Sequence, residues 1–318
     1  MFDFGALLTM IATLFVLLVV GFTVGKLNIV DEIASKRLSA LIIKVAQPAL
    51  IVNSLIGMEY SWKNLILGLK VLAFGFVVHG FIAVIAYLAC FRFKKLNERK
   101  ITEFAMVFGN CGFIGIPILT SFFGPIGGFM TSFFIVSFNI IIWIWGIAIL
   151  GRKRPDIKLT PKKALLNFGT VPSVIGFAIF MLPAIMDGFA LPEFLSSGLS
   201  YIASLCTPIS MLIIGALLSR IKFKQIFCTP KAYYLCLFKL IIIPLSVCAL
   251  MKLVGFNQMW ILFGTAICSM PSATSVSMLA ELYDISPEYS AQCVGTSSLL
   301  SIATMPCVIG LADIIAKL

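Results

Sequence analysis

Ten long apolar stretches make up most of this 318-residue chain, and the connections between them are too short to form a separate soluble domain. A membrane-spanning helix needs about twenty predominantly apolar residues. Sixty per cent of the residues are hydrophobic and 12% are charged, whereas soluble proteins carry about 25% charged residues. We therefore expect an all-α polytopic membrane protein with ten transmembrane helices, at residues 5–25, 38–56, 65–90, 101–123, 128–150, 168–186, 194–218, 232–252, 259–282 and 290–315.

The distribution of Lys and Arg predicts how these helices are oriented. Basic residues cluster in the odd-numbered connections, at 26–37, 92–100, 152–163 and 220–231, whereas the even-numbered connections offer only Lys63 and Lys252. Because basic loops face the cytoplasm, both termini are expected on the extracytoplasmic side of a multi-pass cell-membrane protein. The net charge of +11 then belongs to loops beside anionic lipid, and we expect no nucleic-acid partner.

Features in the first five helices recur in the second five. Helices two, three and four resemble helices seven, eight and nine, and an odd number of spans in each repeat reverses the second copy in the membrane. Such inverted repeats are typical of secondary transporters. The predicted divisions are a first five-helix repeat at 1–151, a basic cytoplasmic loop at 152–167 and a second, inverted repeat at 168–318. The matching features are Gln47-Pro48 with Thr207-Pro208, Lys70 with Lys239, and residues 110–117 with 268–274.

The fourth stretch holds two glycines and a proline within six residues, Gly112, Gly115 and Pro117. Proline removes one backbone donor and clashes with the carbonyl four residues earlier. In hydrocarbon, the freed backbone groups are tolerated only inside protein or beside a water-filled cavity. We therefore expect a broken helix, with Pro117 in the first turn of its second half and Asn110 bonding the broken backbone or a ligand. For this helix alone, a kink that only shapes packing is the alternative.

The ninth stretch has a matching interruption, in which Pro271 precedes the small and polar residues Ser272, Ala273, Thr274 and Ser275. Two broken helices at corresponding positions of two repeats are the best sequence indication of a substrate site near the bilayer midplane. Helix N-termini carry partial positive charge, which favours an anionic ligand. The pattern therefore predicts a site for a small anion between these helices.

Two ionisable residues inside apolar stretches are candidates for coupling or for binding the anion's charge. Lys239 lies well inside the eighth stretch, where a cation is costly; it can bind an anion, or serve as an internal ion-pair or backbone contact. His79, in the third, can relay protons because its pKa is near neutrality, although a lone histidine is more often a packing residue. No Asp or Glu occupies the middle of a stretch, so a carboxylate proton relay lacks an obvious carrier.

These residues resemble the auxin efflux carrier family, which includes plant carriers and bacterial permeases for malonate or malate. The resemblance covers essentially the whole chain. The motifs are Asn110-x-Gly112-x-x-Gly115-x-Pro117, Met270-Pro271-x-Ala273-Thr274, Phe138-Asn139 followed by Trp143, and Lys239 ahead of Pro244.

The resemblance implies that helices four and nine cross at Pro117 and Pro271, with a carboxylate bound beside the crossing. Asn110, Asn139 and the polar run of helix nine would line that site. It further implies an elevator-type movement of helices 3–5 and 8–10 against a scaffold of helices 1, 2, 6 and 7, through which a homodimer would form. The short connection at 152–167 is similar to that of the bacterial members. The plant carriers have an acidic residue in helix three for which this chain has no counterpart.

We therefore expect a secondary active transporter, a permease or efflux carrier for a mono- or dicarboxylate such as malate or malonate, with H⁺ or Na⁺ as possible coupling ion. The alternative is a sodium-coupled symporter of the bile-acid type, which has a related ten-helix fold. An intramembrane lipid-modifying enzyme would need a cluster of acids, bases or nucleophiles, and a single histidine argues against one. We expect no catalytic residue, no cofactor and no metal site.

Overall fold

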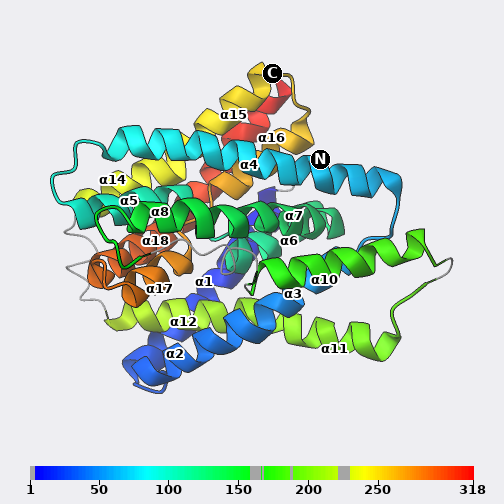
Figure 1. Cartoon of the computed structure of the whole chain (residues 1–318), viewed down its shortest axis with the longest axis horizontal. Coiled ribbons are helices and arrows are strands. Elements are labelled where there is room, and N and C mark those ends of the chain that lie inside the picture. Colours follow the sequence, from blue (N-terminus) through cyan, green and yellow to red (C-terminus); the bar gives the residue numbers. More distant parts are fainter. Residues whose placement is uncertain (1–3, 158–165, 167, 187–188, 221–229) are drawn as a thin grey trace.

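The computed structural model describes residues 4–157, 166, 168–186, 189–220 and 230–318. These residues form helices and one isolated β-bridge (Figure 1). The α-helices and the short π- or 3₁₀-turns (η) are α1 (Phe4–Lys26), α2 (Glu32–Leu41), η1 (Ile42–Ala46), α3 (Gln47–Ile56), α4 (Trp62–Cys90), α5 (Leu96–Val107), η2 (Cys111–Gly115), α6 (Ile116–Phe123), α7 (Pro125–Ile141), η3 (Ile142–Gly146), α8 (Ile147–Leu150), α10 (Thr170–Met181), η4 (Leu182–Ala184), α11 (Glu193–Ser204), α12 (Cys206–Arg220), α14 (Pro230–Leu237), η5 (Phe238–Ile242), α15 (Ile243–Leu253), α16 (Gln258–Cys268), α17 (Thr274–Leu282) and α18 (Pro287–Lys317).

Helix is present in each of the ten predicted stretches. Six of them are continuous helical runs long and apolar enough to cross a membrane, at Glu32–Ile56, Trp62–Cys90, Pro125–Leu150, Glu193–Arg220, Pro230–Leu253 and Pro287–Lys317. Shorter apolar helices lie in the other four, at Phe15–Lys26, Cys111–Phe123, Thr170–Ala184 and Gln258–Cys268. The all-helical architecture is confirmed for the described residues and is consistent with a multi-pass membrane protein, and the count of ten spans stays a prediction.

Three of the π-turns end two residues before a proline. Pro48, Pro117 and Pro244 each follow a residue whose N–H bonds the carbonyl five residues earlier; Ile116 to Cys111 is one example. A proline ring clashes with the carbonyl four residues before it, and one wider turn moves that carbonyl aside while the helix continues. The sequence therefore keeps long helices through proline by widening one turn.

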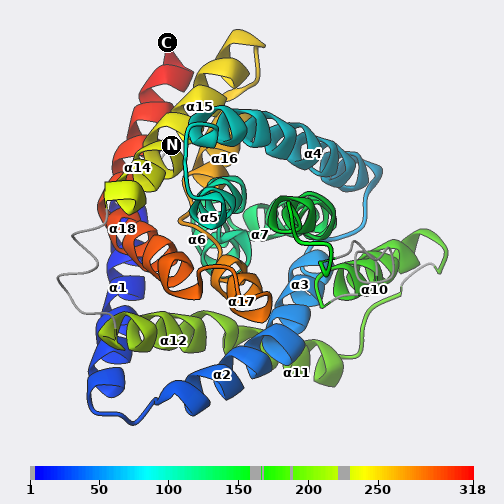
Figure 2. The same ribbon diagram turned by 60° about the vertical axis from the view of Figure 1, so that its left-hand side comes forward.

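Two pairs of helices approach closely through glycine. A Cβ on Gly21 of α1 would lie 2.7 Å from the Cα of Leu212 in α12, and one on Gly176 of α10 would lie 3.1 Å from the Cα of Val52 in α3. Small residues permit such close backbone packing in membranes, where dispersion contacts hold helices together. The two pairs lie with α2 and α11 along one side of the molecule (Figure 2).

The remaining helices surround α5. Every residue from Lys100 to Val107 is buried, and α4, α8, α14, α17 and α18 all pack against this helix. Its apolar residues belong to the large core that includes Phe104 and Phe108. In Figure 2, α5 and α6 lie near the centre of the molecule. The break between them is therefore held inside protein, which satisfies the requirement for irregular backbone at membrane depth.

Candidate binding site at the helix crossing

The broken helices of the fourth and ninth stretches meet through their backbones. An antiparallel bridge joins Gly109 to Ser272. Residues 108–110 and 271–273 are referred to below as the crossing. Its hydrogen bonds satisfy backbone groups that the breaks leave without helical partners. They run from Asn110 N to Pro271 O (2.7 Å) and from Ala273 N to Phe108 O (2.9 Å).

One expected crossing residue lies elsewhere. Pro271 is at the crossing, where its carbonyl accepts from Asn110, but Pro117 lies in the first turn of α6, beyond η2. The expectation that the helices cross at Pro117 was therefore wrong. The physical reason is that the helix already runs from Cys111 through Pro117, with one widened turn before the proline, so Pro117 does not break it. The extended segment that can pair with another chain comes earlier, at residues 108–110.

Asn110 caps the second half of the broken fourth helix and retains an unused donor. Its Oδ1 accepts from the N–H of Phe113 at 3.2 Å, whereas its Nδ2 is buried and has no hydrogen-bond partner among the described residues. The residue is 3% exposed. Buried side-chain donors are nearly always satisfied by protein, water or ligand. Asn110 therefore presents an amide donor at a helix N-terminus, as a site for an acceptor requires.

The polar run of the ninth stretch divides into two groups. Ser272 is bonded within the protein, since its Oγ donates to Ala105 O (3.0 Å) and its N–H donates to Ser297 Oγ (3.1 Å). Farther on, in α17, the hydroxyls of Ser275 and Ser277 are buried and have no partner in the part of the chain that the structure describes. Ser272 therefore stabilises the crossing, and the donors still available are in the first turns of α17.

Lys239 lies against the crossing. It is 1% exposed, and a Cβ on Gly109 would be 3.0 Å from its Nζ. Its electrostatic neighbours are the thiols of Cys111 and Cys268 and the ring of His79. No ion pair with a carboxylate is found for it among the described residues. The ammonium therefore lies where the C-terminal ends of α5 and α16 meet, and these ends carry partial negative charge.

His79 packs among aromatic rings beside the same break. Its Nδ1 lies 2.6 Å from the carbonyl of Gly75, and its ring contacts those of Phe108, Phe134 and Phe138 at centroid distances of 6.0, 5.0 and 6.0 Å. The residue is 2% exposed. A bond from Nδ1 to a carbonyl assigns the ring proton to Nδ1, which leaves Nε2 as the acceptor.

Asn139 and the two glycines of the fourth stretch have different neighbours. Asn139 lies against Gly169, since a Cβ built on Gly169 would lie 2.0 Å from the Nδ2 of Asn139. This contact joins α7 to the start of α10. Gly112 approaches Gln47, whose Nε2 would be 3.0 Å from a Cβ at that position. Gly115 packs near Asn110 and Thr131. Gly112 and Gly115 are thus part of the turn after Asn110, whereas Asn139 contacts a neighbouring helix.

Sequence reasoning missed two polar residues near the crossing. Gln47 of α3 was noted only for the proline after it, and Ser297 of α18 was not singled out. Ser297 accepts from the backbone of Ser272, and Gln47 lies beside Gly112. A polar amide directly before a mid-helix proline is the signal that identifies Gln47. Nothing in the spacing of Ser297 distinguishes it from the other hydroxyls of its helix.

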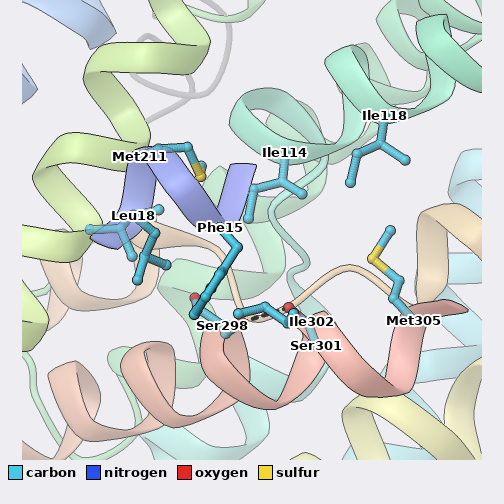
Figure 3. Close-up of a pocket in the computed structure, with 10 residues that line it drawn as sticks. Phe15, Leu18, Ile114, Ile118, Met211, Ser298, Ser301, Ile302 and Met305 are labelled. Carbon is cyan, nitrogen blue, oxygen red and sulfur yellow. Dashed lines mark hydrogen bonds between the residues drawn. The ribbon is translucent and has the colours of Figure 1, made fainter. Parts of the chain in front are cut away.

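A small cavity of 40 Å³ lies between α1, α12, α18 and the η2–α6 helix. Figure 3 shows Phe15, Met211, Ile114 and Ser298 around it, from four different elements. Among the described residues, the Oγ of Ser298 is buried without a partner. The volume admits a few water molecules at most, so the cavity is too small for a carboxylate.

Comparison with known proteins identifies the chain's relatives. Residues 6–309 match the family described as membrane transport protein. The chain is 26% identical over 298 residues to an uncharacterised transporter of Methanocaldococcus jannaschii, covering 91% of this chain and 94% of that protein. It is 23% identical over 299 residues to an uncharacterised transporter of Methanothermobacter thermautotrophicus, covering 93% and 95%.

These matches extend over nearly the full length, through both broken helices and the crossing. They agree with the family that the sequence motifs indicate, and such a family of transporters is not one of enzymes. Together with the apolar helices, they identify a multi-pass membrane protein. The chain belongs to the membrane transport protein family, that of the auxin efflux carriers, and is a transporter.

Proposed function

We propose that this transporter is a secondary active carrier for a small organic anion, a mono- or dicarboxylate such as malate or malonate, bound beside the crossing. The unpaired Nδ2 of Asn110 carries this proposal. A carboxylate oxygen accepts such a donor, and the N-terminal ends of the η2–α6 helix and of α17 add partial positive charge. Ser275, which has an unpaired hydroxyl in the first turn of α17, is the second proposed donor.

The charges at the crossing favour an anion over a sodium-dependent ligand. Sodium, a hard cation like magnesium and calcium, prefers oxygen ligands such as carboxylates. Among the described residues, Glu103 bonds Arg152 and Asp313 bonds Gln258 and Lys317. Lys239 already brings one positive charge to the C-terminal ends of α5 and α16. The bile-acid type of sodium symport therefore has less support than a carrier that needs no bound sodium.

The close helix pairs support two inverted repeats, at residues 1–151 and 168–318. Gly21 contacts Leu212, which is four residues after Pro208, and Gly176 contacts Val52, which is four residues after Pro48. The first helix of each proposed repeat therefore packs against the second helix of the other repeat. In both cases the contact is four residues after the proline of that second helix. This reciprocity is expected of a two-fold axis in the membrane plane.

The α1–α12 and α10–α3 pairs also support the proposed scaffold, which is formed by helices 1, 2, 6 and 7. The other six helices would move against it. Alternating access of the elevator type would carry the crossing past the α1–α12 face. A homodimer would form through scaffold helices, with the termini on the extracytoplasmic side and the 152–167 connection in the cytoplasm of a cell-membrane protein.

The direct test is flux in proteoliposomes. The purified protein is reconstituted, and uptake of a panel of labelled carboxylates is measured under imposed proton, sodium or voltage gradients. We expect saturable flux of a small carboxylate without a sodium requirement. Flux of a bile acid that depends on sodium would favour the alternative function, and no carboxylate flux under any gradient would contradict the proposal.

The Asn110→Ala variant tests the site in the same assay. An unmet buried hydrogen bond costs about 1–3 kcal/mol, so flux at low substrate concentration should fall by roughly tenfold or more. Asn64→Ala is the matched control, because Asn64 donates to the backbone of Glu59 at the start of α4. Flux that is equally high in Asn110→Ala, with correct insertion, would contradict this placement of the site.

A further inference from the structure

A second, larger concavity lies on the outer face of the protein, away from the proposed carboxylate site. It measures 630 Å³ and lies between α4 and the α7–α8 helix, which pack side by side (Figure 2). Apart from His79, Tyr87 and Arg152, its walls are apolar, and include Phe76, Val84 and Leu88 from α4 and Ile144 and Trp145 from the facing helix. This volume is within the range of ligand pockets, about 300–1,000 Å³. We refer to it as the α4 groove.

The groove is long enough for one acyl chain. Its α4 wall runs from Phe76 to Leu88, which at 1.5 Å per helical residue is about 18 Å. One leaflet contributes about half of the 30 Å hydrocarbon core. The groove therefore matches the depth of a single leaflet.

A glycine at mid-length keeps the groove open. Gly80 lines it, and a Cβ built on Gly80 would meet no atom within 4 Å. Most glycines of the chain contact a neighbouring helix instead; Gly75, one turn earlier on α4, would place a Cβ 1.9 Å from Ser137 Oγ. Gly80 thus permits no close helix packing, and its effect is to leave space on the membrane-facing side of α4.

One end of the groove is basic. Arg152 lines it and donates two hydrogen bonds to Glu103, of 2.5 and 2.7 Å, while Arg99 approaches the same carboxylate at 4.0 Å. Both guanidinium groups lie over the ring of Tyr87. Two cations, Arg99 and Arg152, face the one carboxylate of Glu103, so these three residues together keep a positive charge. A guanidinium has five N–H donors, and Arg152 uses two of them on Glu103.

We propose that the α4 groove binds an anionic phospholipid, with an acyl chain along α4 past Gly80 and the headgroup phosphate at Arg152. The basic end begins the connection that is expected in the cytoplasm, where the leaflet carries anionic lipid. Charge complementarity at one end and a wall along the rest that is apolar except for His79 and Tyr87 fit a phospholipid better than a polar peptide. The lipid would remain bound to α4 and α7 whichever way the crossing faces.

The test uses the fluorescence of Trp145, which lines the groove. Replacing Trp62, Trp143 and Trp260 by Phe leaves Trp145 as the reporter. The purified protein is titrated in detergent with phosphatidylglycerol or phosphatidylcholine carrying brominated acyl chains, which quench nearby tryptophan. We expect half-quenching by phosphatidylglycerol at about fivefold lower concentration, since one basic residue near an anionic lipid contributes about 1 kcal/mol. Equal quenching by both lipids would overturn the headgroup assignment.

Two variants separate the acyl groove from its basic end. Gly80→Phe fills the groove without a clash and should abolish saturable quenching, whereas Gly198→Phe in α11, where a Cβ also meets nothing within 4 Å, should leave it unchanged. Glu103→Gln/Arg152→Gln removes the guanidinium without leaving Glu103 unpaired, and should remove the preference for phosphatidylglycerol. Undiminished quenching in Gly80→Phe would overturn the proposal. Loss of a dimer in that variant, with quenching retained, would assign the groove to a second copy of the chain.

Discussion

Asn110 and Lys239 are both buried at the crossing, yet they face opposite helix ends. Asn110 begins the η2–α6 helix, whose N-terminal N–H groups favour an anion. Lys239 lies against Gly109, where α5 and α16 end. A buried ammonium is costly unless its charge is compensated, and the carbonyls of two converging helix ends supply such compensation. This separates the proposed roles: Asn110 contacts the substrate, and Lys239 stabilises the crossing.

Lys239→Met tests that separation. A cation at a partly buried helix end contributes up to about 2 kcal/mol, so we expect a lower thermal unfolding temperature in detergent with nearly unchanged carboxylate affinity in the folded protein. Affinity is measured by equilibrium binding and stability by thermal unfolding on one preparation. Unchanged stability together with a loss of binding would instead assign Lys239 to the anion.

At the scale of the helices, proline and glycine spacing predicted much of the structure. The fourth and ninth helices are both broken. Pro271 lies at the break of the ninth helix, where proline removes a backbone donor, whereas the fourth helix breaks at residues 108–110, before Pro117. The position of the crossing was not predictable, since it depends on the extended residues 108–110, which form strand-like pairs only with a distant segment. The neighbour of Asn139 was not predictable for a similar reason, because Gly169 lies on another helix. Its Nδ2 is buried without a hydrogen-bond partner among the described residues, so its place in the site stays a prediction.

The α1–α12 contact gives a prediction at this scale. A Cβ on Gly215 would lie 2.2 Å from the carbonyl oxygen of Leu18, so Gly215→Leu must push the helices apart. Overpacking typically costs about 1–3 kcal/mol, and we expect a loss of monodisperse protein by size-exclusion chromatography and earlier thermal unfolding. Gly198→Leu is the control, because that position is open. Similar behaviour of the two variants would contradict the packing.

A second prediction at this scale concerns the buried ion pair between α5 and the start of the central connection. Glu103 is fully buried and bonds Arg152. Arg152→Gln leaves this carboxylate without its main partner, which should cost about 3–5 kcal/mol in thermal or denaturant unfolding. The double variant with Glu103→Gln should recover most of that stability. If the single variant were as stable as the double, the pair would not be structurally important.

At the scale of the molecule, the helices form two groups that meet at the small cavity beside η2. Composition and the basic connections predicted a multi-pass helical protein, because both follow from the bilayer itself. Which helices pair was not predictable from periodicity, since lipid-facing and protein-facing surfaces are equally apolar. The glycine contacts that define the pairs, such as Gly21 with Leu212, become evident only in three dimensions.

Movement between the two groups can be tested by cross-linking across the cavity. Phe15 of α1 and Ile302 of α18 both line it, one from each proposed group. In a cysteine-free background, Phe15→Cys/Ile302→Cys joined by a flexible bifunctional maleimide should lose transport, and the uncross-linked pair should retain it. Leu18→Cys/Met211→Cys, which joins α1 to α12 in the same cavity, should remain active when cross-linked. Full transport by the cross-linked Phe15–Ile302 pair would argue against an elevator movement.

The proposed binding of a small carboxylate at Asn110, beside the crossing, can be measured on the purified protein. The experiment is equilibrium binding of radiolabelled malonate and malate, with Asn110→Ala and Asn64→Ala compared on equal amounts of folded protein. We expect saturable binding of at least one of these anions, weakened by about tenfold or more in Asn110→Ala and unchanged in Asn64→Ala. Equally tight binding to Asn110→Ala and to the native protein would contradict it.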